Sequence, residues 1–247
     1  MRRFFVPSDE KLDGGVSIQL GGDEFHHLKN VCRLETGERV ELLDGRGRIA
    51  VAVIGEMGKK TATLAVESVR NVAPMPKPHV EIVLCVPRFQ KMDVIIQKSA
   101  ELGAVTLVPV VSERSFMKSV SKELLAKSHR WEKIAAEACK QSGRAWPLTI
   151  AEPSSLKEKI SQTPRGRGLF LYEGEAAEDI RSCLQSWVAP ETLTVFIGAE
   201  GGFSPQEVQE FEKAGMAPVT LGPLVLRVET ACIAILSVIQ YHFGGMR

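Results

Sequence analysis

From residue 80 onward, the chain alternates short apolar runs of strand length with longer stretches that have helical spacing. This alternation is typical of a mostly parallel sheet with helices on both faces, because parallel neighbours are joined by crossovers that cover the sheet. Ligands of such sheets bind beyond the carboxyl ends of the strands. We therefore expect an α/β fold with a binding edge, built on strands at residues 80–86, 106–111, 168–171, 193–197 and 219–221.

The first seventy residues follow a different pattern, in which short strand-like runs are separated by glycine-rich turns. Only residues 23–34 have helical spacing in this part of the chain. Many short strands with turn signals between them are typical of a small β-barrel. The expected strands are residues 4–6, 16–20, 40–43, 49–54 and 61–69.

Residues 71–78 separate these two patterns and contain three prolines, Pro74, Pro76 and Pro78. Because proline restricts the backbone, a segment of this kind is a stiff linker. We place the domain boundary here, with one domain at residues 1–73 and a second at residues 74–247.

The composition is that of an ordinary soluble protein, with 44% hydrophobic and 25% charged residues in a chain of 247. No apolar stretch approaches the length that spans a membrane. The cysteines are odd in number, widely spaced and free of any CxxC pair, which indicates neither a disulfide framework nor a zinc site. We expect a cytoplasmic protein with reduced thiols at Cys32, Cys85, Cys139, Cys183 and Cys232.

The net charge of +1 conceals an uneven distribution along the chain. Residues 76–150 hold 12 lysines and arginines against 7 aspartates and glutamates. A phosphate-rich partner is drawn to such a basic region, because neutralising phosphates supplies most of the sequence-independent affinity for nucleic acid. A solvated helix face would produce the same count, so charge alone leaves both interpretations open.

Residues 195–236 contain two glycine-marked turns, each of which follows a strand-like run and leads into a helix. Glycine adds no Cβ and tolerates positive φ, so these turns bring bare backbone close to a ligand. After the first turn, Ser204, Pro205 and Glu207 form the pattern of a capped helix start. A phosphate-binding loop is disfavoured, because the lysine of that motif is missing and Glu200 would repel an anion.

This segment resembles the C-terminal signature of the SPOUT superfamily of knotted RNA methyltransferases, and within it the RsmE-type family. The matching residues are the GAEGGFS run at 198–204, Leu221-Gly222-Pro223 and the LRVETA run at 226–231. Ala199 replaces the usual proline of this family and Val228 the usual threonine. The resemblance implies an α/β domain with a deep trefoil knot, a PUA-like RNA-binding domain before it, S-adenosylmethionine as methyl donor, and a homodimer.

The family methylates N3 of a uridine in 16S ribosomal RNA. The resemblance therefore implies that the partner is 16S ribosomal RNA or the small ribosomal subunit. That nitrogen becomes nucleophilic only after losing its proton, so a base and a cation for the flanking oxygens are wanted. Arg227 is our candidate for the cation and Glu200 or Glu229 for the base. Either glutamate could instead complement a helix macrodipole. The implied cofactor-binding residues are Leu171, Tyr172, Glu173, Gly198, Ala199, Glu200, Gly201, Gly202, Leu221, Gly222 and Leu226.

Further motifs of the family indicate contacts with RNA. A helix at residues 88–103 carries two lysines seven residues apart on its polar side, and Gly143 is an expected helix stop before an arginine. Two adjacent histidines near the N-terminus do not indicate a metal site, since helical neighbours diverge by about 100° and no other ligand lies at the right spacing. The charged residues could instead keep the surface soluble, and the histidine could instead pack in the core. The expected RNA-binding residues are His26, Arg33, Arg88, Lys91, Lys98, Arg114 and Arg144.

Two other functions stay open at this point. One is a related knotted methyltransferase that acts on another RNA base or on a ribose hydroxyl. The other is a non-catalytic RNA-binding or ribosome assembly factor, which the departures at Ala199 and Val228 motivate.

Overall fold

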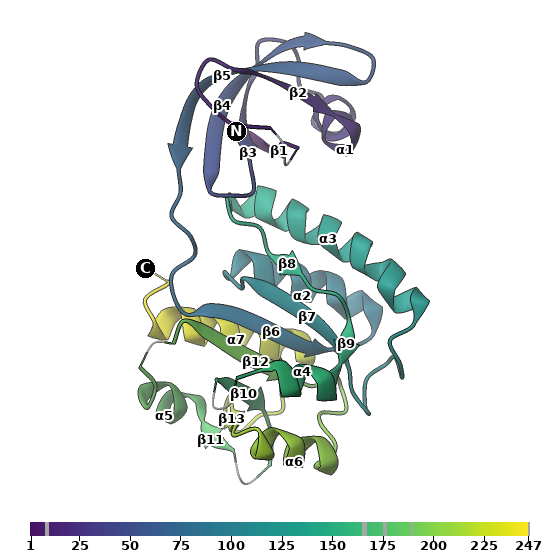
Figure 1. Cartoon of the computed structure of the whole chain (residues 1–247), viewed down its shortest axis with the longest axis vertical. Coiled ribbons are helices and arrows are strands. Elements are labelled where there is room, and N and C mark those ends of the chain that lie inside the picture. The colour runs from purple at the N-terminus through teal and green to yellow at the C-terminus, as the bar shows by residue number, and fades with distance from the viewer. Residues whose placement is uncertain (8–9, 165–166, 175–176, 189, 247) are drawn as a thin grey trace. The chain divides into compact units, whose positions relative to one another are not determined.

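A computed structural model describes residues 1–7, 10–164, 167–174, 177–188 and 190–246. The chain divides into two compact units, each described here by itself (Figure 1). The first unit consists of Met1–Pro74 together with Cys139–Pro147, and the second of Met75–Ala138 with Leu148–Arg247. The return of residues 139–147 to the first unit has no signal in the sequence pattern.

The first unit is built on a five-stranded sheet in the order β1-β3-β4-β5-β2. All neighbours are antiparallel except β1 and β3, which run parallel. Alternate residues of these strands are buried, and Phe4, Ile18, Leu42, Ile54 and Leu64 belong to one core. The strands are β1 (Arg2–Phe5), β2 (Ser17–Gly21), β3 (Arg39–Leu43), β4 (Arg48–Met57) and β5 (Thr61–Asn71).

The expected helix at residues 23–34 is shorter and changes type midway. Helix α1 (Gly22–His26) continues into the π-helical turn η1 (His27–Val31). Phe25 and Leu28 point into the core, which explains the helical spacing in the sequence. The helical turn then ends before Arg33, whose φ of 54° lies in the left-handed region.

The end of helix α3 (Lys122–Ser142) contributes to the first unit through residues 139–142. Gly143 follows with a φ of 77°, and its amide donates to the Lys140 carbonyl over 3.3 Å. The Arg144 amide donates to the Cys139 carbonyl over 2.9 Å, which completes a Schellman stop. The helix stop expected at Gly143 is confirmed.

The second unit holds a sheet in the order β11-β13-β10-β12-β6-β7-β8, with β9 also paired to β7. Every described pairing is parallel, so the expected α/β sheet is confirmed. Three of its strands are only two residues long and gave no sequence signal. The strands are β6 (His79–Cys85), β7 (Thr106–Val111), β8 (Thr149–Ile150), β9 (Ser154–Ser155), β10 (Gly168–Leu171), β11 (Glu178–Asp179), β12 (Thr192–Ile197) and β13 (Ala217–Thr220).

Helices cover both faces of this sheet (Figure 1). On one face, α4 and α6 pack over an aromatic cluster in which Phe170 stacks on Phe211 at 4.4 Å between ring centroids. Helices α2 and α7 pack against each other, and α7 contacts β12. The trefoil knot implied by the resemblance stays a prediction. The helices are α2 (Phe89–Glu101), α4 (Leu156–Gln162), α5 (Ile180–Gln185), α6 (Pro205–Lys213) and α7 (Val228–His242).

Candidate functional site

Three chain segments that lie far apart in the sequence line the same hollow at the carboxyl ends of β10, β12 and β13. One cavity of about 490 Å³ is lined by parts of residues 171–173, 197–202 and 225–231, together with Lys91. A second cavity of about 220 Å³ adjoins it and shares Leu171, Glu173 and Leu226. Small-molecule sites are typically several hundred Å³, so the two hollows together suit a ligand of nucleoside size.

The first glycine turn follows β12 and forms the wall of the larger cavity. A Cβ on Gly198 would lie 3.0 Å from the Gly202 Cα and 3.1 Å from its carbonyl carbon. Gly202 itself has a φ of 65°, and its amide donates to the Ala199 carbonyl over 2.9 Å. The turn therefore needs glycine at both ends, one because of space and one because of backbone conformation.

The capping box expected after this turn is present. The Ser204 hydroxyl accepts from the Glu207 amide over 3.3 Å, and the Glu207 carboxylate accepts from the Ser204 amide over 2.8 Å. The other Glu207 oxygen accepts from the Glu113 amide over 2.8 Å. One carboxylate thus ties the start of α6 to the segment after β7, which holds the turn rigidly.

Ala199, where the family has proline, is buried close to the Cys85 thiol at the end of β6. Burial raises the pKa of the Cys85 thiol to about 12, so this neighbour is uncharged. Alanine at this position is therefore compatible with the turn.

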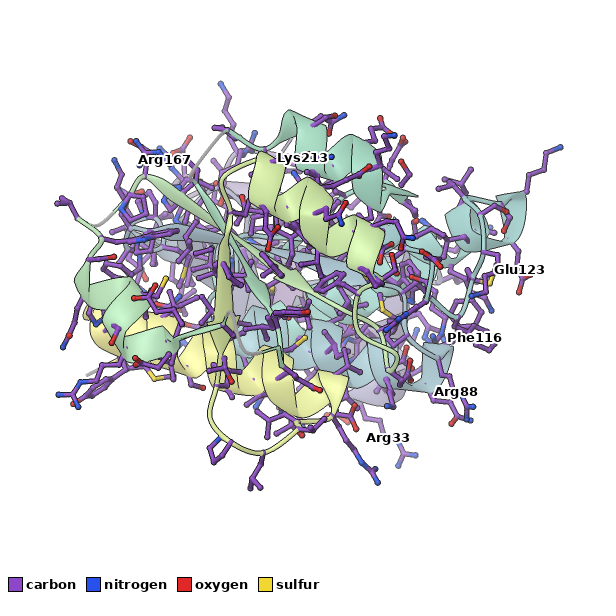
Figure 2. The ribbon with its side chains drawn as sticks, turned by 90° about the horizontal axis from the view of Figure 1, so that it is seen from below. Arg33, Arg88, Phe116, Glu123, Arg167 and Lys213 are labelled. Atoms are coloured by element: carbon purple, nitrogen blue, oxygen red, sulfur yellow. The ribbon has the colours of Figure 1, made fainter. Side chains whose placement is uncertain are left out.

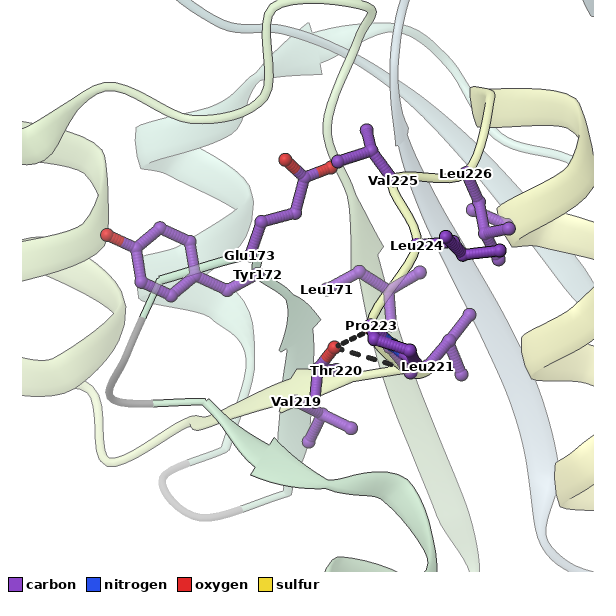
Figure 3. Close-up of a pocket in the computed structure, with 12 residues that line it drawn as sticks. Leu171, Tyr172, Glu173, Val219, Thr220, Leu221, Pro223, Leu224, Val225 and Leu226 are labelled. Carbon is purple, nitrogen blue, oxygen red and sulfur yellow. Dashed lines mark hydrogen bonds between the residues drawn. The ribbon is translucent and has the colours of Figure 1, made fainter.

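The second glycine turn lies after β13 and covers the smaller cavity (Figure 3). The Thr220 hydroxyl donates to the Gly222 carbonyl over 3.0 Å and accepts from its amide over 3.3 Å. Beyond it, Leu224 and Val225 are 77% and 74% exposed. The Glu173 side chain reaches across this hollow towards Val225. The opening of the pocket is therefore apolar along this segment, with a carboxylate beside it.

The charged groups of the larger cavity are centred on Lys91, on the first turn of α2. Its ammonium lies 3.2 Å from a Glu200 oxygen and 3.3 Å from a Glu229 oxygen. Burial raises the pKa of Glu200, but hydrogen bonds from its own amide and from Lys91 outweigh burial and hold the pKa below its usual value. Both candidate bases thus meet at one cation, which the sequence had suggested as a phosphate contact.

Arg227 is exposed, lies at the N-cap position of α7 and lines the same cavity. Its carbonyl accepts from the Ala231 amide over 2.8 Å, which begins the helix. Glu229 follows in the first turn of α7, where a carboxylate complements the helix dipole. The two readings of Glu229 are therefore not exclusive, because the residue starts a helix and also contacts Lys91, which lines the cavity.

The other expected RNA contacts of the second unit lie around this edge or along α2. Arg88 is exposed, and its amide approaches Glu200 at 3.5 Å. Arg114 donates to the Gly201 carbonyl over 2.8 Å, and a Cβ on Gly201 would press against its side chain. Lys98 pairs with Glu101 over 2.7 Å. Of the two lysines on α2, the structure brings Lys91 into the cavity and leaves Lys98 on the helix surface.

In the first unit, His26 and Arg33 are exposed on and after α1. Arg144 is only 8% exposed, and its Nε donates to the Trp146 carbonyl. Its burial follows from the Schellman stop, which turns the chain back into the unit. The sequence pattern carries no signal for this burial, because an arginine after a helix is usually solvated.

The donor set of the cavity suits an organic ligand with both charged and polar portions, because Lys91 and Arg227 line it together with glutamates. Two glutamates face the hollow, and the bare backbone of both glycine turns offers N–H and C=O groups for a base or an amino acid portion. Among the residues that the structure describes, no group of three or more histidine, cysteine or carboxylate side chains is arranged to hold a metal ion. Within the same residues, no helix combines the length and apolar character needed to cross a bilayer.

Comparison with known families agrees with this geometry. Residues 74–240 match the model of an RNA methyltransferase domain, and residues 20–67 match an RNA methyltransferase PUA domain. The Aquifex aeolicus ribosomal RNA small subunit methyltransferase E is 31% identical over 94% of this chain and 96% of its own length. The Bacillus subtilis protein of the same name is 28% identical over the whole chain and 99% of its own length.

Two solved structures superpose on nearly the whole chain. The ribosomal RNA small subunit methyltransferase E of Neisseria gonorrhoeae, bound to S-adenosyl methionine, has a TM-score of 0.85 and 30% identity over 98% of this chain and 97% of that one. A Legionella pneumophila structure with bound SAM has a TM-score of 0.88 and 30% identity over 97% and 96%. The resemblance seen in the sequence is confirmed, and the chain belongs to the ribosomal RNA small subunit methyltransferase E family.

Proposed function

We propose that this protein transfers a methyl group from S-adenosylmethionine to N3 of a uridine in 16S ribosomal RNA. One observation carries the proposal: in a chain of this family, three separate segments converge on one cavity that holds two carboxylates, a lysine and Arg227. The named relatives act on small-subunit ribosomal RNA, and two solved neighbours hold the methyl donor.

The donor site is formed by the ends of the three strands. Leu171, Tyr172 and Glu173 supply one side, the turn from Gly198 to Gly202 the second, and Leu221, Gly222 and Leu226 the third. When bound, S-adenosylmethionine supplies an electrophilic methyl group on a positive sulfur. Backbone groups of the turns bind its polar portions, and the carboxylate of Glu200 or Glu173 balances its positive charge. Holding donor and acceptor in line accounts for roughly 7 to 11 kcal/mol of the barrier.

The catalytic roles fall to groups that line the cavity or contact Lys91 there. Arg227 stabilises the uracil oxygens as negative charge develops on them, and Glu200 or Glu229 accepts the N3 proton. Lys91 acts as a positioning residue, because its ammonium contacts both carboxylates and keeps them beside one another. A carboxylate that is already ionised can accept the N3 proton directly.

The RNA is bound by cations outside this cavity. In the second unit we assign Arg88, Arg114 and Lys98 to the phosphate backbone, which favours arginine and lysine on an exposed edge. In the first unit we assign His26 and Arg33, which are both exposed. Arg144 has the least support among the proposed contacts, because it is buried and donates to Trp146.

The decisive experiment is methylation of 16S RNA from cells that lack this protein, with the RNA digested to nucleosides and analysed by mass spectrometry. We expect a single new methylated uridine with the methyl on N3. A methylated ribose or another methylated base would support the alternative methyltransferase. Calorimetric titration with S-adenosylmethionine covers the non-catalytic alternative, since no heat at millimolar ligand would argue for an assembly factor.

We also propose a homodimer formed through α7, in a protein that acts in the cytoplasm where ribosomal RNA is found. Ile233 and Val238 of this helix remain half-buried in the single chain, and Tyr241 is 79% exposed. Apolar side chains left in this state on one helix suit a second copy of the chain. Light scattering of the purified protein tests the proposal, and a mass of one chain of 27.1 kDa at micromolar concentration would reject it.

A further inference from the structure

Phe116 presents an exposed aromatic ring on a chain segment that is bonded to the wall of the proposed donor cavity. It lies five residues after the end of β7 and is 53% exposed, although aromatic rings of this size are usually mostly buried. Neither the donor site nor the proposed phosphate contacts use it. Figure 2 shows Phe116 and Arg88 on the same side of the second unit.

The backbone under this ring is fixed to the cavity wall. The Phe116 amide donates to the Val86 carbonyl over 3.1 Å, directly after β6. Ser115 is 2% exposed, and its hydroxyl lies 2.8 Å from the Ser112 hydroxyl. Arg114 donates to the Gly201 carbonyl over 2.8 Å. The ring therefore projects from a segment that is bonded to the same turn that lines the cavity.

A second ring supports Phe116 from one side, and a cation lies over that second ring. Phe89, at the start of α2, meets it edge to face with 5.6 Å between centroids and an interplanar angle of 76°. The Lys127 ammonium lies 4.9 Å from the Phe89 centroid. Phe89 contacts Trp131 as well, at 6.5 Å. The ring of Phe116 is thus held by an edge contact, and much of its surface stays open to solvent.

The charges around the ring favour a polyanion. Arg88 precedes Phe89, and Arg114 and Lys118 lie within two residues of Phe116; all three are exposed. On the acidic side, Asp93 is paired with Arg130, so the exposed Glu113 carboxylate stands against these three cations. The surface around Phe116 therefore combines an aromatic face with a local excess of positive charge, which is the combination that binds single-stranded nucleic acid.

We infer that Phe116 stacks on an unpaired base of the RNA substrate, next to the uridine that enters the cavity. This inference rests on the proposed function. N3 lies on the Watson–Crick edge of uracil, so the target must be unpaired and turned out of its stack before methylation. Its neighbour then loses a stacking partner, and the ring of Phe116 replaces it. Stacking on an aromatic face tolerates any base, so the contact contributes affinity rather than sequence readout.

The test measures binding of a fluorescently labelled single-stranded oligouridylate by anisotropy, together with KM for 16S RNA. Phe116→Ala should weaken oligouridylate binding and raise the RNA KM by about ten-fold or more, which is within the range for loss of one base stack. Phe116→Trp should restore both values, whereas Phe116→Leu, which keeps an apolar side chain without a ring, should not. Leu125→Ala, at a residue 45% exposed on α3, is the matched control and should change neither.

Salt dependence separates stacking from charge. Phe116→Ala should leave the slope of log affinity against log salt unchanged, whereas Lys118→Ala should flatten it by 0.9 or less. Wild-type affinity and KM in both Phe116→Ala and Phe116→Leu would overturn the stacking role, as would a wild-type protein that does not bind oligouridylate. Absence of methyl transfer by a wild type that still binds RNA through Phe116 would count only against the proposed function.

Discussion

At the scale of single residues, the structure gives Lys91 neighbours that differ from the phosphate contact that the sequence suggested. Helical spacing placed it away from Met92 and Ile96, but Ile95, one turn further along the same face, is also buried. Spacing along one helix says nothing about what lies opposite, and here the opposite groups are the carboxylates of Glu200 and Glu229. The ammonium therefore belongs to the candidate site rather than to a free cationic surface.

Lys91→Met removes the cation between the two carboxylates. Because Lys91 lowers the pKa of Glu200, its loss should raise that pKa, so the activity lost on acidification should be lost at a higher pH than in the wild type. The pH profile of kcat measures this shift. Lys91→Arg should keep the profile close to normal, and Lys77→Met, which breaks an exposed pair with Glu191, serves as the control. An unmoved acid limb in Lys91→Met would contradict the positioning role.

Arg227→Ala tests the proposed stabilisation of the uracil oxygens. We expect methyl transfer to fall by at least ~10²-fold, comparable to the loss of one oxyanion donor, with affinity for S-adenosylmethionine within a few-fold of wild type. Single-turnover kinetics and calorimetry measure the two quantities. Because Arg227 is exposed and begins α7 through its backbone, the substitution should not disturb folding. Turnover at the wild-type rate would remove Arg227 from catalysis.

At the scale of elements, the two glycine turns decide where the donor can lie. The backbone of Gly198 and Gly202 approaches so closely that no side chain fits between them. The capping box at Ser204 and the hydrogen bond that the Glu113 amide donates to Glu207 keep the turn in this conformation. The turn is therefore a preformed part of the site, which lowers the entropic cost of binding.

Gly198→Ala should damage the donor site without damaging the unit. Its Cβ would lie 3.0 Å from the Gly202 Cα, so the backbone of the turn must shift. We expect affinity for S-adenosylmethionine to fall by about ten-fold or more, as measured by calorimetry. Gly14→Ala is the control, since no atom lies within 4 Å of a Cβ there. Equal affinity in wild type and Gly198→Ala would show that the donor does not depend on this turn.

At the scale of the whole molecule, the structure places four of the five cysteines in the interior. Cys85, Cys139, Cys183 and Cys232 are buried, and Cys32 is half-buried. Burial raises the pKa of Cys183 to about 11 and also raises that of Cys232. The thiolate is the reactive form of cysteine. These thiols therefore resist modification for two reasons: reagents cannot reach them, and they stay protonated.

An alkylating reagent at pH 8 should therefore modify Cys32 first in the native protein, and all five cysteines in denaturant. Peptide mass spectrometry after timed quenching gives the rate at each position. Adding S-adenosylmethionine should slow any residual modification at Cys85, since ligand binding stabilises the native state against opening. Rapid native modification of Cys85 or Cys232 would mean that the second unit opens far more readily than its packing indicates.

The strands and helices that carry the site were largely predictable, because each has a local signal. Strand β7 and strand β10 have the expected bounds, and the Gly143 stop and the Ser204 capping box follow from local backbone chemistry. The two-residue strands β8, β9 and β11 were not predictable, since they exist only through their pairing partners. The burial of Arg144 depends in the same way on residues far away in the chain.

The sequence by itself determined the alternation of strands and helices, the glycine turns and the family, because these depend on neighbours within a few residues or on motifs in a fixed order. Only the tertiary structure decided that residues 171–173, 198–202 and 221–227 line adjoining hollows, and that Lys91 joins Glu200 to Glu229 there. It also left the ring of Phe116 open beside that site. The physical reason is that a parallel sheet brings together strand ends from distant positions, and their side-chain contacts depend on how those strands and the helices over them pack.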